Sequence, residues 1–293
     1  FNIKSKFLPG HLKLPKKRNF VTNLFVSLHQ TVVLFLIESR LFVLTKRIEQ
    51  LNLTDKMFAN NYLTQEQQAV LSRSFSVLMR NVYTWMSLGL VMTAFTALFV
   101  SKSEALVYSI ATTPALMWGL FIAELAMVII LSARIMRMSF LTAGLMFAAY
   151  AILNGVTLSF IFLAYTAQSI AQTFFITAGT FGAMSLVGFF IKKDLSTMGR
   201  MLYMLLIGLI IATVVNIFVA SSGLAMIINY AGVAIFVGLT AYDTQKIKHM
   251  MLSYGAAGVT DETNKLALLG SLTLYLDFIN LFLYLLRFFG DRK

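Results

Sequence analysis

Asp277 is an ionisable residue in the middle of a long apolar segment that runs from Leu274 to Leu286. A second carboxylate, Asp243, ends the apolar segment before it. A charged side chain at the centre of a bilayer costs roughly 2.5–3.5 kcal/mol even on the insertion scales that give the smallest values. Ionisable groups kept at that depth are usually functional, so these two carboxylates are interpreted first as a proton or cation site.

The composition is that of a polytopic membrane protein. Of the 293 residues, 58% are hydrophobic and 12% charged, and the charged fraction is about half of that in a typical soluble domain. Apolar segments recur, each close to the ~20 residues with which a helix crosses a bilayer. They are expected at 82–100, 113–133, 139–165, 170–191, 201–220, 225–251 and 266–289. The sequence therefore predicts an all-α integral membrane protein with a bundle of seven transmembrane helices.

Basic residues gather in alternate loops. They are Arg73, Arg80, Arg134, Arg137, Lys192, Lys193, Arg200, Lys246, Lys248 and Lys265. The positive-inside rule places these loops, and the N-terminus, in the cytoplasm. The basic C-terminal residues Arg287, Arg292 and Lys293 are an exception that a re-entrant seventh segment would remove. That segment is long enough to cross, so seven spans are expected. The net charge of +12 is assigned to the loops, and no nucleic-acid partner is expected.

The sequence excludes several kinds of catalytic and metal site. Without cysteine there are no disulfides, thiolate metal sites or cysteine nucleophiles, and the three histidines lack the spacing of zinc ligands. No glycine-rich phosphate loop occurs. An intramembrane aspartyl protease is a weak alternative, because Tyr242, Asp243 and Thr244 lack the glycine-rich setting expected around such a carboxylate. Neither an enzyme nor a resident cofactor is expected.

Residues 1–56 differ in composition from residues 57–293. They contain no Met and no Ala, whereas all 16 Met lie from Met57 onward. The segment could be a native basic anchor or upstream translation before a start at Met57. The second interpretation is favoured, because residues 60–67 are polar like a short cytoplasmic N-terminus. The expected domains are a basic N-terminal extension, 1–56, and a seven-span membrane domain, 57–293.

The depths of the two carboxylates place them at similar heights. Asp243 lies eight residues from the end of its expected span, and Asp277 lies eleven residues from the start of the next. At ~1.5 Å per residue their heights differ by about 5 Å. Two carboxylates this close in a low dielectric cannot both ionise cheaply, so the pair should share one proton and titrate as a unit. Oxygen ligands without thiolate or imidazole suit a proton or Ca²⁺.

Polar side chains accompany the two carboxylates along the same helical faces. They are Thr240, one turn before Asp243, and Thr273, Asn280 and Tyr284, which share a face with Asp277. These residues are expected to support the ion site.

Structural roles for the acids remain open. Asp243 has an i,i+3 neighbour in Lys246 at the helix end, and such pairs stabilise helices. Asp277 could make a structural hydrogen bond to a neighbouring helix. Glu124, a third acid within a span, either lines the same cavity or pairs with Arg134.

Three segments resemble the Bax inhibitor-1 family of transmembrane Bax inhibitor motif proteins, in its bacterial form. They are Ile152–Phe162, Ala241–Lys248 and Leu274–Gly290. The last two are specific, because each combines an intramembrane Asp with a fixed setting of aromatic and amide residues. The similarity covers residues 57–293 and leaves residues 1–56 outside.

The resemblance implies a seven-helix fold with the C-terminal helix at the centre, in the inner membrane of a bacterium. It also implies a pH-sensitive Ca²⁺ leak channel gated by a di-aspartyl pair, which corresponds to Asp243 and Asp277 and binds Ca²⁺ transiently. A second-helix arginine is implied as a latch on the sixth-helix carboxylate; Arg134 is the candidate and Arg137 the alternative. The 247–265 segment is expected to be a long loop, a departure from the family that leaves the length of the cytoplasmic plug open.

Two other functions remain open. The family's name favours a regulatory protein that binds and restrains a membrane protease or a stress or death pathway, with structural aspartates. A shared-proton pair also suits a proton-coupled Ca²⁺ exchanger. The expected partners are the lipid bilayer, Ca²⁺ and protons, with a membrane protease in the regulatory alternative.

Overall fold

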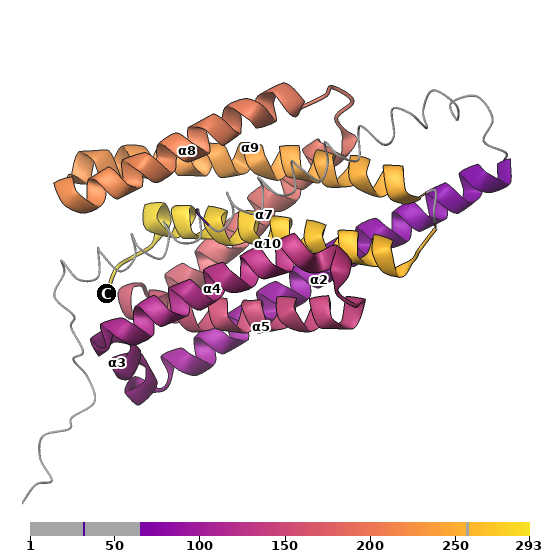
Figure 1. Ribbon diagram of the computed structural model, residues 1–293. Coiled ribbons are helices and arrows are strands. Elements are labelled where there is room, and N and C mark those ends of the chain that lie inside the picture. Colours follow the sequence, from indigo (N-terminus) through magenta and orange to yellow (C-terminus); the bar gives the residue numbers. More distant parts are fainter. Residues whose placement is uncertain (1–31, 33–64, 256–257) are drawn as a thin grey trace, which may run out of the picture.

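The chain folds into a bundle of long helices. The computed structural model describes residue 32, residues 65–255 and residues 258–293 (Figure 1). Among these residues, seven helices are long and apolar enough to cross a membrane, which confirms the predicted number of spans and the all-α membrane fold. The expected N-terminal extension, 1–56, lies outside the described residues except for Val32.

The helices follow one another through short connections. In chain order they are α2 (Gln65–Ser101), α3 (Glu104–Thr112), α4 (Pro114–Arg134), the 3-10 turn η1 (Ile135–Arg137), α5 (Phe140–Leu158), α6 (Ile161–Ala164), α7 (Ala167–Phe190), α8 (Ser196–Val219), α9 (Ser222–Gly255) and α10 (Asp261–Phe289). Hydroxyl side chains cap several helix starts by accepting backbone N–H groups, as preferred N-cap residues do. These caps are Ser103, Ser139, Thr166 and Thr260.

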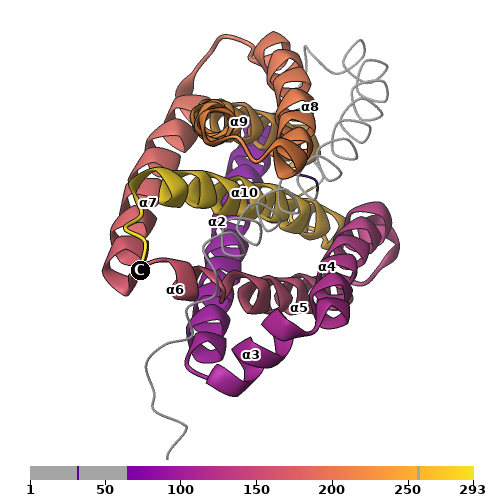
Figure 2. The same cartoon turned by 90° about the vertical axis from the view of Figure 1, so that its left-hand side faces the viewer.

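The last helix, α10, is the most completely enclosed of the spans. Its apolar window is 100% buried, whereas that of the next most buried span is 56% buried. It packs against α2, α5, α7 and α9, and Figure 2 shows it between α9 on one side and α5 on the other. A central position for the C-terminal helix stays a prediction of the family resemblance, but burial on all sides makes α10 the helix whose polar side chains have to be satisfied inside the bundle.

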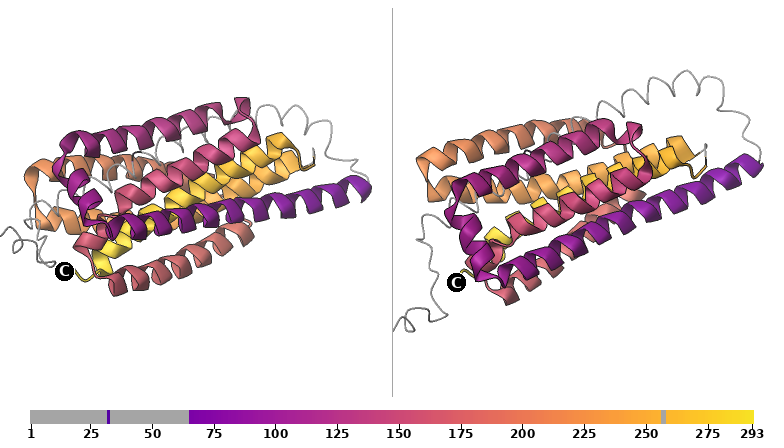
Figure 3. Two further views of the ribbon diagram at one scale, coloured as in Figure 1. Left: turned by 90° about the horizontal axis from the view of Figure 1, so that it is seen from below. Right: turned by 60° about the horizontal axis from the view of Figure 1, so that its bottom comes forward.

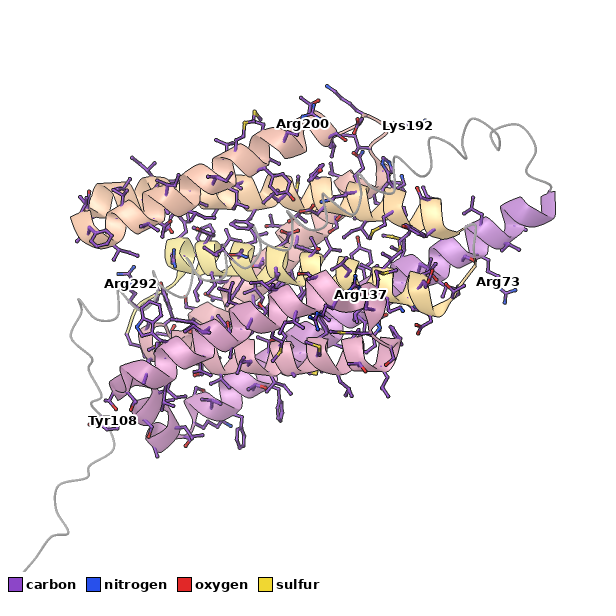
Figure 4. The ribbon with its side chains drawn as sticks, viewed as in Figure 1. Arg73, Tyr108, Arg137, Lys192, Arg200 and Arg292 are labelled. Atoms are coloured by element: carbon purple, nitrogen blue, oxygen red, sulfur yellow. The ribbon has the colours of Figure 1, made fainter. Side chains whose placement is uncertain are left out.

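The basic residues separate along the length of the bundle. In Figure 4, Arg73, Arg137, Lys192 and Arg200 lie toward the end that carries the α9–α10 connection, and Arg292 lies toward the other end. The views in Figure 3 agree, because the C-terminus lies at the end opposite the start of α2. This separation is the one that seven crossings require. Which end faces the cytoplasm stays a prediction.

The predicted start of the first span was wrong. A start at 82 was expected, but α2 begins at Gln65 and its membrane-length part at Ala69. The additional turns are held by tertiary contacts: the ring of Phe75 stacks on that of Phe189 at 6.0 Å, and Asn81 Nδ2 donates to Asn264 Oδ1 over 3.1 Å. Hydropathy alone misses them, because this part of the helix mixes polar and apolar residues.

The expected long loop at 247–265 was also wrong. Helix α9 continues to Gly255 and α10 begins at Asp261, so only residues 256–260 lie between the two helices. Thr260 caps α10. Lys265 Nζ lies 2.9 Å from Asp261 and donates to the carbonyl of Met138 over 3.2 Å, which ties this helix start to the η1–α5 turn. The polar residues that suggested a loop belong to the ends of α9 and α10, where these helices continue beyond their apolar segments.

Candidate functional site

The contacts between α9 and α10 fix the register of the two helices. At one point the ring of Phe236 stacks on that of Tyr284 with 5.4 Å between centroids. At another, a Cβ built on Gly270 would lie 3.1 Å from the side chain of Ile247. Residue numbers rise along α9 as they fall along α10 between these contacts, so the helices are antiparallel.

This register places Asp243 and Asp277 on facing surfaces at similar heights. Asp243 lies seven residues after Phe236, and Asp277 lies seven residues before Tyr284, so both are two turns from the same contact. Counted from the contact of Ile247 with Gly270, the two positions differ by three residues, or about 4.5 Å. Both side chains are 0% exposed. Spacings of four and seven residues keep each aspartate on the face that touches the other helix.

The expected polar neighbours line the same faces and bond to their own helices. Thr240 Oγ1 donates to the carbonyl of Phe236 over 2.8 Å. Thr273 Oγ1 donates to that of Leu269 over 3.2 Å, and Asn280 Nδ2 to that of Leu276 over 2.9 Å. Local bonds of this kind give the hydrogen-bond donors of these side chains a partner inside the bundle. The facing surfaces of α9 and α10 therefore carry a continuous row of polar groups.

The cations near the pair occupy different environments. Lys246 is buried, and its Nζ lies 5.6 Å from the ring centroid of Tyr242 and 6.0 Å from that of Tyr203, which is a cation–π geometry. Arg134 and Arg137, the two candidates for a latch, are exposed at the end of α4 and in η1. Because Asp243 is fully buried, a latch by either arginine requires a rearrangement that carries its side chain into the bundle.

Glu124 is buried at a different interface. It projects from α4 and accepts a hydrogen bond from Thr157 Oγ1 on α5. The structure therefore gives Glu124 a hydroxyl partner, whereas Arg134, the structural partner expected from the sequence, is exposed ten residues farther along. Thr157 lies one turn after Asn154, which belongs to a second polar cluster.

That second cluster, centred on Tyr275, was missed by sequence reasoning. Thr93 Oγ1 donates to the carbonyl of Ala151 over 2.8 Å and lies 2.6 Å from the Tyr275 hydroxyl, so the tyrosine O–H is left to donate to Thr93. Asn154 Nδ2 donates to the Tyr275 oxygen over 2.9 Å. The cluster joins α2, α5 and α10. Its signal in the sequence is Asn154, the one amide side chain in a mostly apolar span.

Replacing Tyr275 by phenylalanine is expected to destabilise the protein by about 1–3 kcal/mol. The change removes the acceptor of Asn154 Nδ2 and the donor to Thr93, both at buried positions. Thermal unfolding in detergent would measure the loss. Tyr108→Phe is the matched control, because Tyr108 is 54% exposed; equal melting temperatures for the two variants would contradict the prediction.

A groove between α2 and α7 approaches the level of Asp243 from the side. It has a volume of about 510 Å³, and its lining includes Tyr83 and Ser185. Ser185 Oγ accepts a hydrogen bond from Thr244 Oγ1 over 3.3 Å, and Thr244 follows Asp243 in α9. Hydroxyl groups thus connect this groove to the helix segment that carries one of the two aspartates.

The site offers few ligands for a metal ion. Among residues 65–255 and 258–293, the structure brings together no group of three or more His, Cys, Asp or Glu side chains that could hold a metal. A tightly bound Ca²⁺ takes six to eight oxygen ligands. Two carboxylates with hydroxyl and amide neighbours suit weak, transient cation binding, and conduction requires binding that is weak enough to release the ion.

In the part of the chain that the structure describes, seven membrane-length helices, with two buried aspartates on facing surfaces of the last two, define a polytopic membrane protein with an intramembrane acidic pair. Residues 75–293 match the family described as "Inhibitor of apoptosis-promoting Bax1". The chain therefore belongs to the Bax inhibitor-1 family, as the sequence resemblance predicted.

Bacterial relatives match over most of their length. The inner membrane protein YbhL of Escherichia coli strain K12 is 50% identical over 215 residues, which cover 73% of this chain and 92% of YbhL. A protein of Deinococcus radiodurans is 42% identical over 230 residues, or 78% of this chain and 96% of its own length. One from Borreliella burgdorferi is 43% identical over 233 residues, or 79% and 98%.

Proposed function

We propose that the protein is a pH-sensitive Ca²⁺ leak channel of the bacterial inner membrane, gated by Asp243 and Asp277. The observation that carries the proposal is the α9–α10 register, in which two fully buried carboxylates face one another at similar heights. A carboxylate at membrane depth is expensive, and two on facing surfaces are more so unless a proton or a cation neutralises them.

The gating step follows from the charge of the pair. With one shared proton the two carboxylates can stay together inside the bundle, and the path between α9 and α10 is closed. When that proton leaves, two negative charges repel at close range in a low dielectric, so the helices separate or a cation enters. Flux is therefore expected to be low at acidic pH and to rise as pH increases. The complete burial of both side chains favours a closed state for the present arrangement.

The arginine latch is a secondary part of this proposal. Arg134 and Arg137 are exposed, and the pair is enclosed without them. Replacing Arg134 should therefore affect the pH response less than replacing either aspartate. The name of YbhL supports the inner membrane as the location, and the separation of basic residues along the bundle supports a cytoplasmic N-terminus.

The test is Ca²⁺ flux into liposomes that contain the full chain, measured across pH. Asp243→Asn and Asp277→Asn should each abolish the rise of flux at alkaline pH, because an amide resembles the protonated acid. Asp194→Asn is the matched control. Asp194 is exposed in the α7–α8 connection, outside the membrane spans, where hydrogen bonds from Ser196 lower the pKa of its carboxyl group. Flux curves that stay unchanged in both site variants would end the proposal.

A proton-coupled Ca²⁺ exchanger is the second candidate, because a shared proton on the same pair suits antiport as well as gating. The two functions differ in their response to a proton gradient. A leak depends on the pH at the pair, whereas an exchanger drives Ca²⁺ against its own gradient when a proton gradient is imposed. Net Ca²⁺ accumulation inside liposomes without a Ca²⁺ gradient would favour the exchanger.

A further inference from the structure

An apolar pocket lies at the outer surface of the bundle between α2, α6, α7 and α10. Its volume is about 290 Å³. Its side chains are apolar except for Thr93, whose hydroxyl is engaged with Ala151 and Tyr275. Several lining residues are exposed at the bundle surface, including Phe175 at 73% and Leu98 at 46%. The pocket therefore opens sideways, toward the hydrocarbon of the membrane.

The depth of the pocket matches one leaflet of a bilayer. Its lining on α2 extends from Leu98, near the end of the helix, to Leu90, eleven residues before the last residue Ser101. On α10 it reaches Phe278, eleven residues before the helix ends. At ~1.5 Å per residue the pocket extends about 16 Å inward from the helix ends, and half of a ~30 Å hydrocarbon core is about 15 Å. An acyl chain of one leaflet has the length to occupy it.

The end of the pocket near the helix termini carries the basic C-terminal residues. Arg292 pairs with Tyr165 in an antiparallel bridge, and Lys293 N donates to the carbonyl of Ala164 over 3.1 Å. Lys293 Nζ donates to the carbonyl of Phe162, a lining residue of the pocket, over 2.8 Å. Figure 2 shows this end of the chain beside α6 and the first turns of α7.

Two exposed cations lie at this end of the pocket and can contact the phosphate of a lipid headgroup. Arg292 and Lys293 are both exposed, so their cations are available to a ligand in the membrane interface. Asp291 is also exposed, and it and the terminal carboxylate of this chain have the opposite charge, so recognition of a phosphate depends on direct contacts with the two cations and not on a net positive charge. The start of α7 lies at the same place, because its first residue, Ala167, lines the pocket, and helix N-termini carry partial positive charge.

We propose that this pocket is a binding site for an anionic glycerophospholipid of the surrounding bilayer. One acyl chain occupies the space between α2, α7 and α10, and the phosphate lies against Arg292 and Lys293. The site is in the leaflet on the side of the C-terminus and is separate from the carboxylate pair, so it does not depend on the proposed Ca²⁺ function. Lining residue Phe278 follows Asp277 in α10, which places a bound chain against the helix that carries the pair.

Native mass spectrometry of the full chain, titrated with phosphatidylglycerol or with phosphatidylcholine of the same acyl chains, tests the proposal. Phosphatidylglycerol is expected to bind more tightly, and Arg292→Gln and Lys293→Gln to weaken it roughly fivefold for each charge removed. Ala94→Phe and Ala171→Phe fill the pocket from exposed positions and should reduce the binding of both lipids. Ala149→Phe, at an exposed position of α5 outside the pocket, is the control.

Two outcomes would overturn the proposal. Unchanged lipid binding in both filled variants would show that the chain lies elsewhere. Equal affinity for the two headgroups, or for a free fatty acid, would show that the C-terminal cations do not recognise phosphate. A photoreactive acyl chain supplies an independent readout in the wild-type protein, so the test does not rely on the filled variants being folded. It should label the segment of α10 around Phe282, and labelling confined to α8 would count against the site.

Discussion

Replacing Gly188 by alanine is expected to lower the stability of the protein by about 1–3 kcal/mol or more, the range for overpacked buried sites. A Cβ at this position on α7 would overlap the backbone carbonyl oxygen of Ala241 on α9. A backbone carbonyl cannot rotate away as a side chain does, so the two helices would have to separate. Thermal unfolding in detergent and the yield of folded protein measure the effect.

The same helix provides a matched control for this change. A Cβ built on Gly179 meets no atom within 4 Å, so Gly179→Ala adds a methyl group to open space. Alanine is better than glycine in a helix by up to about 1 kcal/mol, so this variant should be neutral or more stable. A melting temperature for Gly188→Ala as high as that for Gly179→Ala would show that the α7–α9 contact is looser than the structure describes.

The contact at Gly188 also bears on the acidic site. Ala241 lies two residues before Asp243 in α9. Thr244, the residue after Asp243, donates a hydrogen bond to Ser185 of α7. Close approach of α7 therefore holds the segment of α9 that carries one of the two aspartates. Helices in membranes approach this closely only where small residues allow it. A variant that separates α7 from α9 should disturb the pair without changing either carboxylate.

The sequence predicts the features of this fold that depend on hydropathy and on isolated charges. Seven spans follow from apolar length, and the similar heights of Asp243 and Asp277 follow from counting residues inward from the α9–α10 connection. The predicted difference in height is correct although the predicted loop was too long. Helix α9 ends later, and α10 begins earlier, than expected by similar numbers of residues, so the two errors in the helix ends cancel when the heights are subtracted.

Features that depend on tertiary contacts could not be predicted in this way. In the sequence, the polar turns at the start of α2 resemble an unstructured N-terminal segment. They are helical because Phe75 contacts Phe189 of α7 and Asn81 bonds to Asn264 of α10. Glycines within the spans look alike in the sequence, and only the neighbouring backbone separates Gly188, which has no room for a Cβ, from Gly179, which does. Tyr275 could not be predicted as the centre of a polar cluster, because the sequence contains many other aromatic residues. Its role depends on the Thr93 and Asn154 side chains, which bond to its hydroxyl in the folded protein.

The largest functional effect is expected from the two aspartates together, in a double-mutant cycle on the pH response of Ca²⁺ flux. If both carboxylates hold one shared proton, either Asp→Asn change removes the titrating unit, and the second change has nothing left to remove. Each single variant should therefore hold alkaline flux near the acidic level of the wild type. The double variant should differ from the singles by less than roughly twofold, because groups that act as one unit are not additive.

Measuring the thermal stability of the variants distinguishes a lost pH response from a loss caused by unfolding. Asp243 and Asp277 are fully buried, and replacing a buried ionisable group by a neutral one of similar volume removes a desolvation cost. Melting temperatures of both single variants should therefore equal or exceed that of the wild type while the pH response disappears. Additive losses of flux in the cycle would mean that the aspartates titrate separately on α9 and α10, and the register between the two helices would then explain their burial but not a shared switch.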